Sequence, residues 1–319
     1  MKVVITDYQY PNIDQEKRII AEAGFELFDY QYKDEENLIR VCRDADAIIV
    51  QYAEITKSVI DTLQNCKMII KYGIGVNNID VDAASQKGIY VCNCPDYGID
   101  EVANHAIALL FSLIKKLPII QKAFRSGDWG NSSLVPLYRL SGQKLGLVGL
   151  GRIPMSVAKK MAGFNVEILG YDPYLSQEAA DQAGIKLVDF DTLCRECDII
   201  SIHCPLVPET THIFNKDTFS KMKKSAFLIN TARGPVINEQ DLIEALEQGQ
   251  IAGAGLDVFE KEPLEQTSKL LQMDNVICTP HIAWYSEEAI NNLQKNVALE
   301  VVNTLKTNNP WNAVNKNKL

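Results

Sequence analysis

A glycine-rich turn between an apolar strand and a helix constrains the fold of this 319-residue chain more than any other feature. The apolar run Lys144–Val148 leads directly into Gly149-Leu150-Gly151, and a helical pattern follows from Met155 to Gly163. The next apolar run, Val166–Gly170, is followed by Asp172, 21 positions (172 minus 151) after the second glycine. This order of strand, glycine turn, helix, strand and acidic residue predicts a βαβ unit that binds a dinucleotide.

Each residue of this motif has a physical reason to be there. Gly149 permits the tight turn, and Gly151 lets the backbone approach a pyrophosphate without an intervening side chain. The N–H groups of Arg152 and Ile153 at the helix start would face that anion. Asp172 would accept hydrogen bonds from the adenosine ribose and repel a 2′-phosphate, so NAD is expected rather than NADP.

The motif departs from the usual fingerprint at its third glycine, where this chain has Pro154. Proline is tolerated in the first turn of a helix, because its missing N–H has no partner there. We therefore expect a small local shift and an intact site. The alternative interpretation is a plain glycine-rich turn followed by a solvated aspartate.

Short apolar runs alternate with helical patterns through most of the chain, which predicts parallel sheets covered on both faces. A long helical segment, Asp100–Arg125, separates two such arrays, and the C-terminal helix Ser286–Leu305 comes too late to belong to the second. The expected fold is α/β, with two doubly wound, Rossmann- or flavodoxin-like domains and a cleft between them. Residues 1–99 plus 286–319 would form a discontinuous substrate-binding domain, and 100–285 the NAD-binding domain. The runs typical of strands are Val3–Ile5, Ala47–Val50, Met68–Ile70, Ile89–Val91, Lys144–Val148, Val166–Gly170, Ile199–Ile202, Ala226–Asn230, Gly253–Val258 and Asn275–Cys278.

Composition excludes several classes of partner. The chain has 32 Lys and Arg against 41 Asp and Glu, a net charge of -9, which disfavours nucleic acids and membrane surfaces. Residues Met1–Thr6 have no basic segment followed by an apolar one, and no apolar run is long enough to span a membrane. Eight cysteines without a secretory signal suggest reduced thiols and a cytoplasmic protein. Cys194 and Cys197 form a single CxxC without a second pair, so no metal site is expected.

Three later segments, together with two in the first hundred residues, resemble the D-isomer-specific 2-hydroxyacid dehydrogenase family. The resemblance covers nearly the whole chain, with the motifs in the right order. Its closest likeness is to the C-terminal-binding-protein branch, through Tyr171–Tyr174 and Cys278–Ser286. The segments that match the family are Asn230–Gly234, Leu256–Pro263, Thr279–His281, Gly73–Asp80 and Cys92–Pro95.

The resemblance implies a role for each candidate catalytic residue. Arg233 would bind the carboxylate and carbonyl oxygen of the substrate, a task that suits its planar guanidinium. His281 would donate the proton in reduction and accept it in oxidation, as histidine commonly does near neutral pH. Glu262 would pair with His281 and favour the imidazolium. Glu260, two residues earlier, remains the alternative partner.

The resemblance also assigns binding residues. Asp257 would lie near the nicotinamide, and Trp284 would form a wall of the substrate pocket. Among the other histidines, His203 and His105 are expected to be packing or structural residues, and His212 a solvated loop residue. Further cofactor contacts would come from Pro205, Thr210, Thr231 and Ala232. The substrate carboxylate would be held by Lys71 and by backbone N–H groups of Gly73, Ile74, Gly75 and Val76.

These observations together predict an NAD-dependent enzyme that interconverts a small 2-oxo acid and its D-2-hydroxy acid. One alternative is a 3-phosphoglycerate dehydrogenase, which would need further basic residues, whereas Trp284 favours an apolar substrate side chain. The other is an NAD(H)-sensing, co-repressor-like binding protein. The apolar segment Asp100–Leu117 with Ile119 and Ile120 predicts a homodimer, and the resemblance implies the same.

Overall fold

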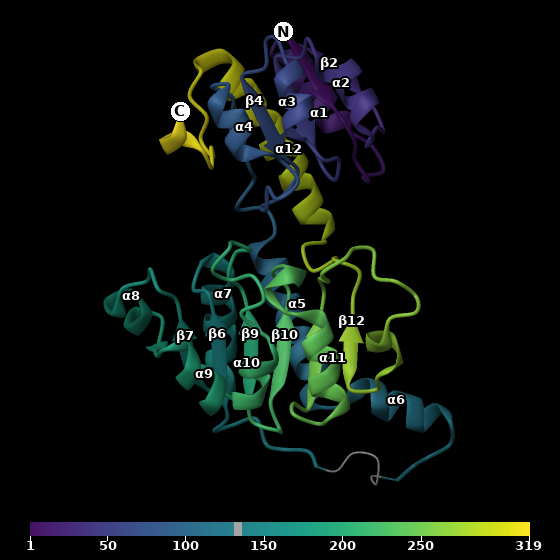
Figure 1. Cartoon of the computed structure of the whole chain (residues 1–319), viewed down its shortest axis with the longest axis vertical. Coiled ribbons are helices and arrows are strands. Elements are labelled where there is room, and N and C mark those ends of the chain that lie inside the picture. Colours follow the sequence, from purple (N-terminus) through teal and green to yellow (C-terminus); the bar gives the residue numbers. More distant parts are fainter. Residues whose placement is uncertain (131–135) are drawn as a thin grey trace. The chain divides into compact units, whose positions relative to one another are not determined.

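A computed structural model describes residues 1–130 and 136–319 of the chain. The chain divides into two compact units. Unit 1 consists of Met1–Gly98 and Ser286–Leu319, and unit 2 of Ile99–Tyr285. In the described residues each unit contains one parallel sheet, and the expected pair of doubly wound α/β folds is confirmed (Figure 1).

The sheet of unit 1 has five parallel strands in the order β2-β1-β3-β4-β5. Leu38, Val59 and Ile60 belong to the apolar core that α2, α3 and α4 form on one face of this sheet. The elements are β1 (Lys2–Ile5), α1 (Asp14–Glu22), β2 (Glu26–Asp29), α2 (Glu35–Cys42), β3 (Ala47–Val50), α3 (Lys57–Thr62), β4 (Met68–Lys71), α4 (Val81–Gln86) and β5 (Tyr90–Cys92).

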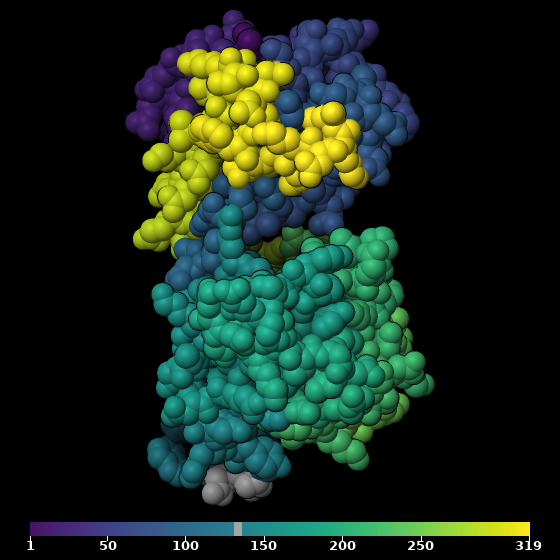
Figure 2. Space-filling view, turned by 90° about the vertical axis from the view of Figure 1, so that its left-hand side faces the viewer, coloured from purple at the N-terminus to yellow at the C-terminus, as the bar shows by residue number. Residues whose placement is uncertain are grey.

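The C-terminal helix α12 (Glu287–Thr307) belongs to unit 1, although its start lies 195 positions (287 minus 92) after the end of β5. It packs against α1 and contacts β3 and β4. After this helix the chain pairs with the sheet region again, because Val314 N–H donates to the carbonyl of Val91 over 2.8 Å. Figure 2 shows these C-terminal residues in yellow against the N-terminal part of the unit. The second face of the sheet is therefore completed by the end of the chain.

The sheet of unit 2 has seven parallel strands in the order β12-β11-β10-β9-β6-β7-β8. The strand order reverses between β6 and β9, which is where a doubly wound sheet binds its ligand. Helices α5, α7 and α8 share one apolar core, and α9, α10 and α11 share another. The elements are α5 (Ile99–Ile114), α6 (Leu117–Arg125), β6 (Lys144–Val148), α7 (Arg152–Met161), β7 (Glu167–Tyr171), α8 (Gln177–Gln182), β8 (Lys186–Leu187), α9 (Phe190–Glu196), β9 (Ile199–Ile202), α10 (Lys216–Lys221), β10 (Phe227–Asn230), α11 (Glu239–Glu247), β11 (Gly253–Leu256) and β12 (Val276–Cys278).

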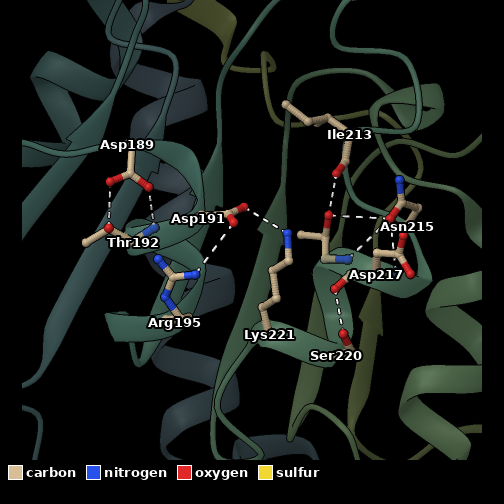
Figure 3. A network of polar contacts seen from close by, with 10 residues as sticks. Asp189, Asp191, Thr192, Arg195, Ile213, Asn215, Asp217, Ser220 and Lys221 are labelled. Carbon is tan, nitrogen blue, oxygen red and sulfur yellow. Dashed lines mark hydrogen bonds and ion pairs between the residues drawn. The ribbon is translucent and has the colours of Figure 1, made fainter.

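Polar side chains fix the short helices on the second face of this sheet (Figure 3). Asp189 caps α9 by accepting from Thr192 N–H over 2.8 Å, and Asn215 caps α10 in the same way. Lys221 of α10 lies 2.9 Å from Asp191 of α9 and joins the two helices. Caps of this kind satisfy N–H groups that a helix cannot satisfy within itself.

The structure differs from the sequence-based prediction in several elements. The expected helix 100–125 is two helices, because Lys116 adopts a left-handed backbone (φ 51°) and Pro118 starts the next helix. Strands β2 and β8 were not predicted, since they lie at sheet edges and are partly exposed. Helix α3 was not predicted either, because its six residues are too few to show a helical period. No helix in the described ranges is both long and apolar enough to cross a membrane.

Candidate active site

The glycine turn after β6 is shaped by a close approach of two backbones. Gly149 has a φ of +83°, and a Cβ atom there would lie 2.7 Å from backbone atoms of Cys204. The loop after β9 is held against it, because His203 N–H donates to the carbonyl of Val148 over 2.7 Å. A Cβ on Gly151 would instead enter open space. The turn is therefore packed against the protein at Gly149 and open at Gly151, where the motif expects a pyrophosphate.

Helix α7 starts directly at this turn. Gly151 is its N-cap, and the first helical hydrogen bond runs from Met155 N–H to Gly151 over 3.2 Å. Arg152 and Ile153 form the first turn, whose N–H groups the helix itself does not use. Pro154 is buried and the helix continues through it. The proline is accommodated because a third-position N–H has no intrahelical partner.

The acidic residue after β7 is tied to the glycine turn. Asp172 accepts from Leu150 N–H over 2.8 Å through one oxygen and from Tyr174 N–H over 2.8 Å through the other. Each carboxylate oxygen can accept more than one hydrogen bond. Asp172 is thus fixed at the turn and still able to accept from a ribose.

The side-chain hydroxyl of Thr210 stabilises the loop after β9. Thr210 donates to the carbonyl of Pro205 over 2.6 Å and accepts from Val207 N–H over 2.9 Å. At the start of this loop His203 bonds Ser201 Oγ over 2.8 Å, and burial lowers the pKa of His203 to about 3. His203 is therefore half-buried and uncharged at neutral pH.

The segment after β10 carries one buried polar atom without a partner. Thr231 is buried, and its Oγ1 has no hydrogen-bond partner among the described residues. Ala232 N–H donates to Asn230 Oδ1 over 3.0 Å, which fixes the turn beside it. Buried hydroxyls in native proteins are normally hydrogen-bonded. An unsatisfied hydroxyl in a segment expected to touch the cofactor fits a site for a polar ligand.

The three candidate catalytic residues lie together in unit 2. His281 Nδ1 is 2.7 Å from Glu262 Oε2, and Glu262 Oε1 accepts from Phe259 N–H over 3.0 Å. Partial burial pushes the pKa of Glu262 upward, but the bond to His281, the charges of His281 and Arg233 and the Phe259 N–H outweigh it. The pKa of Glu262 therefore lies below its ordinary value.

Arg233 is half-buried, and hydrogen bonds fix both its side chain and its backbone. Its Nη1 donates to the carbonyl of Ala232 over 2.6 Å, and its own carbonyl accepts from Asn230 Nδ2 over 2.9 Å. The following Gly234 is packed so closely against the Phe259 backbone that a Cβ would lie 1.9 Å from it. The two loops that carry Arg233 and Glu262 are thereby pressed together.

Glu260 has a different partner. Its Oε1 lies 2.7 Å from His212 Nε2, and it also accepts from Glu239 N–H over 3.2 Å. His212 was expected to be a solvated loop residue; it makes this contact with Glu260, and its side chain is 44% exposed. The alternative pairing of Glu260 with His281 is thus not the one present. Glu262 therefore contacts His281, and Glu260 contacts His212.

Asp257 is almost completely buried, with a side-chain exposure of 1%. Its carboxylate accepts from Thr279 Oγ1 over 2.6 Å, from Ile282 N–H over 3.0 Å and from Ala283 N–H over 2.9 Å. These contacts organise the turn that carries His281. The contact between Thr279 and His105 was not predicted from the sequence, because 174 positions separate the two residues in the chain.

Trp284 lies on the same turn, and its Nε1 donates to the carbonyl of His281 over 3.0 Å. Its ring packs edge-on against Tyr285, with centroids 5.9 Å apart. The indole is therefore fixed beside the candidate proton donor. Its role as a wall of the substrate pocket stays a prediction.

The candidate residues of unit 1 lie at the carboxyl end of β4. Lys71 donates to the carbonyl of Gln51, and its ammonium lies 5.7 Å from the ring centre of Tyr52. Gly73 has a φ of +150°, which other residues seldom adopt. In the described chain, the backbone hydrogen bonds of turns and loops include none donated by Ile74, Gly75 or Val76. Successive N–H groups of this kind suit an anion.

Comparisons with known proteins show which family the chain is similar to. Residues 107–283 match the family described as D-isomer specific 2-hydroxyacid dehydrogenase, NAD binding domain. The chain is 38% identical over 316 residues to a D-3-phosphoglycerate dehydrogenase of Archaeoglobus fulgidus, covering 99% of this chain but 59% of that protein. It is 38% identical to a glyoxylate reductase of Thermofilum pendens, covering 95% and 94%. The structure of an Aquifex aeolicus D-lactate dehydrogenase complexed with NAD and lactic acid superposes with a TM-score of 0.87 at 28% identity, covering 96% of each chain.

Proposed function

Because the chain belongs to the D-isomer-specific 2-hydroxyacid dehydrogenase family, whose NAD-binding domain it contains, we propose that it interconverts a small 2-oxo acid and its D-2-hydroxy acid. The observation that carries this proposal is the grouping of Arg233, Glu262 and His281. A fixed cation, a proton-carrying imidazole and a carboxylate that orients it are what reduction of a carbonyl beside a carboxylate requires.

The residues that would hold NAD fit the cofactor. Gly151 leaves space at the start of α7, Asp172 is fixed at the turn, and Thr231 has an unsatisfied hydroxyl. Pro205, Thr210, Ala232 and Asp257 complete the proposed cofactor contacts. When bound, the cofactor would supply the redox chemistry: NADH would provide the hydride for reduction, and NAD+ would accept it in oxidation. Residues of this chain would bind and orient the substrate and transfer the proton.

His281 would transfer the proton through Nε2. Its Nδ1 is occupied by Glu262, so the opposite ring nitrogen is the one directed to a substrate oxygen. Arg233 would bind the substrate carboxylate and polarise the carbonyl oxygen. Lys71 and the N–H groups of Ile74, Gly75 and Val76 would bind a carboxylate. Gly73 was expected to contribute as well, but its N–H donates to the carbonyl of Lys71 over 2.9 Å. Glu262 would keep the imidazole oriented and favour its charged form.

A phosphorylated substrate is the second candidate, and one observation favours it. Lys33 and Lys71 both approach the ring of Tyr52, at 5.1 and 5.7 Å from its centre. Two positive charges near one ring would favour a second anionic group on the substrate. Relatives named D-3-phosphoglycerate dehydrogenase are consistent with such a substrate. Trp284 instead favours an apolar side chain.

The proposal includes a homodimer in the cytoplasm. The sequence-based prediction placed the interface on the apolar segment Asp100–Leu117, but most apolar residues of α5 are buried in the core of unit 2. Within the described helix α6, by contrast, no side chain is buried, and the large apolar Leu117 and Phe124 are both about half exposed. Figure 1 shows α6 projecting from the body of unit 2. A second copy of the chain would cover this surface. The eight cysteines are all free thiols, which supports a reducing compartment.

The test is consumption of NADH with glyoxylate, pyruvate, phenylpyruvate and 3-phosphohydroxypyruvate, each with wild type and Arg233→Ala. We expect turnover with at least one acid, a D-configured product, and loss of nearly all turnover in Arg233→Ala with NADH affinity largely kept. Preference for 3-phosphohydroxypyruvate would identify the phosphorylated class. NADH binding without turnover of any of the four acids would favour a binding protein instead.

A further inference from the structure

A chain of three hydrogen-bonded side chains connects α5 to the turn that carries His281. His105, in α5, places Nε2 3.0 Å from Thr279 Oγ1, and Thr279 Oγ1 lies 2.6 Å from Asp257 Oδ1. Nε2 of His105 is also 3.7 Å from the same carboxylate oxygen. The side-chain exposures are 24% for His105 and 1% for Asp257, so the contacts are largely shielded from water.

The direction of these bonds follows from proton counting. A threonine hydroxyl has one proton to donate, and the short contact to the Asp257 carboxylate uses it. The hydroxyl oxygen of Thr279 must then accept from His105, which requires a proton on Nε2. His105 is thus the outermost donor of a chain that ends on the buried carboxylate.

That carboxylate determines the shape of the His281 turn. It accepts the N–H groups of Ile282 and Ala283, and the Asp257 carbonyl accepts from His281 N–H over 2.8 Å. His281 itself has a φ of +53°, in the left-handed region that a residue with a side chain seldom adopts. A backbone in this region persists only where its neighbours hold it.

We propose that His105 is a positioning residue for His281, acting through Thr279 and Asp257. By donating to Thr279 it keeps the hydroxyl directed at Asp257, and the carboxylate then keeps both N–H groups of the turn. Without His105 the hydroxyl can rotate, the carboxylate loses a donor, and the turn can relax from its left-handed geometry. The imidazole of His281 would then point away from its productive position.

This inference rests on the proposed role of His281, and the experiment separates the two. His105→Leu removes the donor, and His105→Gln retains an amide N–H at similar reach. We expect kcat to fall about ten- to a hundredfold in His105→Leu, as for a small displacement of a catalytic group, with KM and NADH affinity within about threefold. His105→Gln should recover most of kcat. Asn104→Ala, at the neighbouring exposed position of α5, is the matched control and should leave kcat unchanged.

A double-mutant cycle tests the route. Thr279→Val keeps the shape and removes the hydroxyl, so it should lower kcat as His105→Leu does. The double variant should lose no more than the worse single variant, because both changes break one chain. Additive losses, or a His105→Gln variant as impaired as His105→Leu at unchanged melting temperature, would overturn the proposal.

A readout without turnover completes the test. The backbone amide NMR signals of Ile282 and Ala283 should shift in His105→Leu and in Thr279→Val and return toward wild type in His105→Gln. If wild type turns over no 2-oxo acid but these signals shift, the proposed function fails and the positioning stands. If the signals stay at their wild-type positions in His105→Leu, the positioning role is wrong whatever the activity.

Discussion

The Oε2 atom of Glu262 lies 2.7 Å from Nδ1 of His281. Two residues earlier, Glu260 reaches a different histidine, His212, at the same distance. One short segment thus supplies carboxylates to two imidazoles, of which only His281 belongs to the proposed catalytic group. Because the two carboxylates contact different histidines, removing the charge of Glu260 is a control for removing the charge of Glu262.

Replacing Glu262 with Gln should move the pH dependence of reduction. Reduction needs the charged imidazole of His281, and the Glu262 carboxylate favours that form. The pKa of Glu262 is held below its ordinary value, so its charge persists as pH falls through the usual range near ~4.3. In Glu262→Gln the rate of reduction should therefore begin to fall at lower pH than in wild type as pH rises. A pH series of kcat/KM measures this.

Glu260→Gln removes the same charge from the same segment and serves as the control. Its partner is His212, so the pH profile of reduction should match that of wild type. A shifted profile in Glu260→Gln with an unshifted one in Glu262→Gln would show that the wrong carboxylate has been assigned to His281.

Asp172→Asn should weaken the discrimination against NADPH. The substitution keeps an acceptor for Leu150 N–H and removes the charge that repels a 2′-phosphate. A repulsion of about 1 to 4 kcal/mol corresponds to a change of about fivefold to several hundredfold in the ratio of kcat/KM values. Asp181→Asn, on α8, changes the net charge equally and should have no effect. Equal use of both cofactors by wild type would contradict the ribose assignment.

Gly234→Ala should be strongly destabilising. The added Cβ would lie 1.9 Å from backbone atoms of Phe259, so the loops of Arg233 and Glu262 must move apart. We expect a loss of about 3 kcal/mol or more in the free energy of unfolding, together with most activity. Gly163→Ala meets no neighbouring atom and should stay within about 1 kcal/mol of wild type. Urea denaturation measures both, and similar stabilities would show that the loops are not in close contact.

The exposed face of α6 should form the interface of a homodimer. Leu117 and Phe124 have exposures of 50% and 54%, and glutamates at both positions would place charges on that face. Wild type should sediment as a dimer at micromolar concentration, and the double variant should shift to the monomer. Trp311→Glu, an exposed aromatic of unit 1, should remain dimeric. A monomeric wild type would contradict the prediction.

Much of the fold could be predicted because its signals are local. The glycine turn at Gly149, the apolar strands and the late position of the C-terminal helix all depend on short stretches of sequence. The edge strands β2 and β8 escaped because an edge strand is partly solvated and lacks a continuous apolar run. The break at Lys116 needed a single residue in a left-handed conformation, which the helical period around it conceals.

For the candidate site, the sequence by itself determined which residue types are present and in which order. Arg233, Glu262 and His281 stand in recognisable motifs, because each motif is bound to a strand end or a tight turn. Only the tertiary structure decided which carboxylate meets His281, and that Asp257 holds the turn rather than standing free. It alone brought His105 to Thr279, across 174 positions, because α5 packs beside the strands that precede those loops. Hydrogen-bond partners depend on distances of a few ångströms between distant segments, and no local pattern in the chain encodes them.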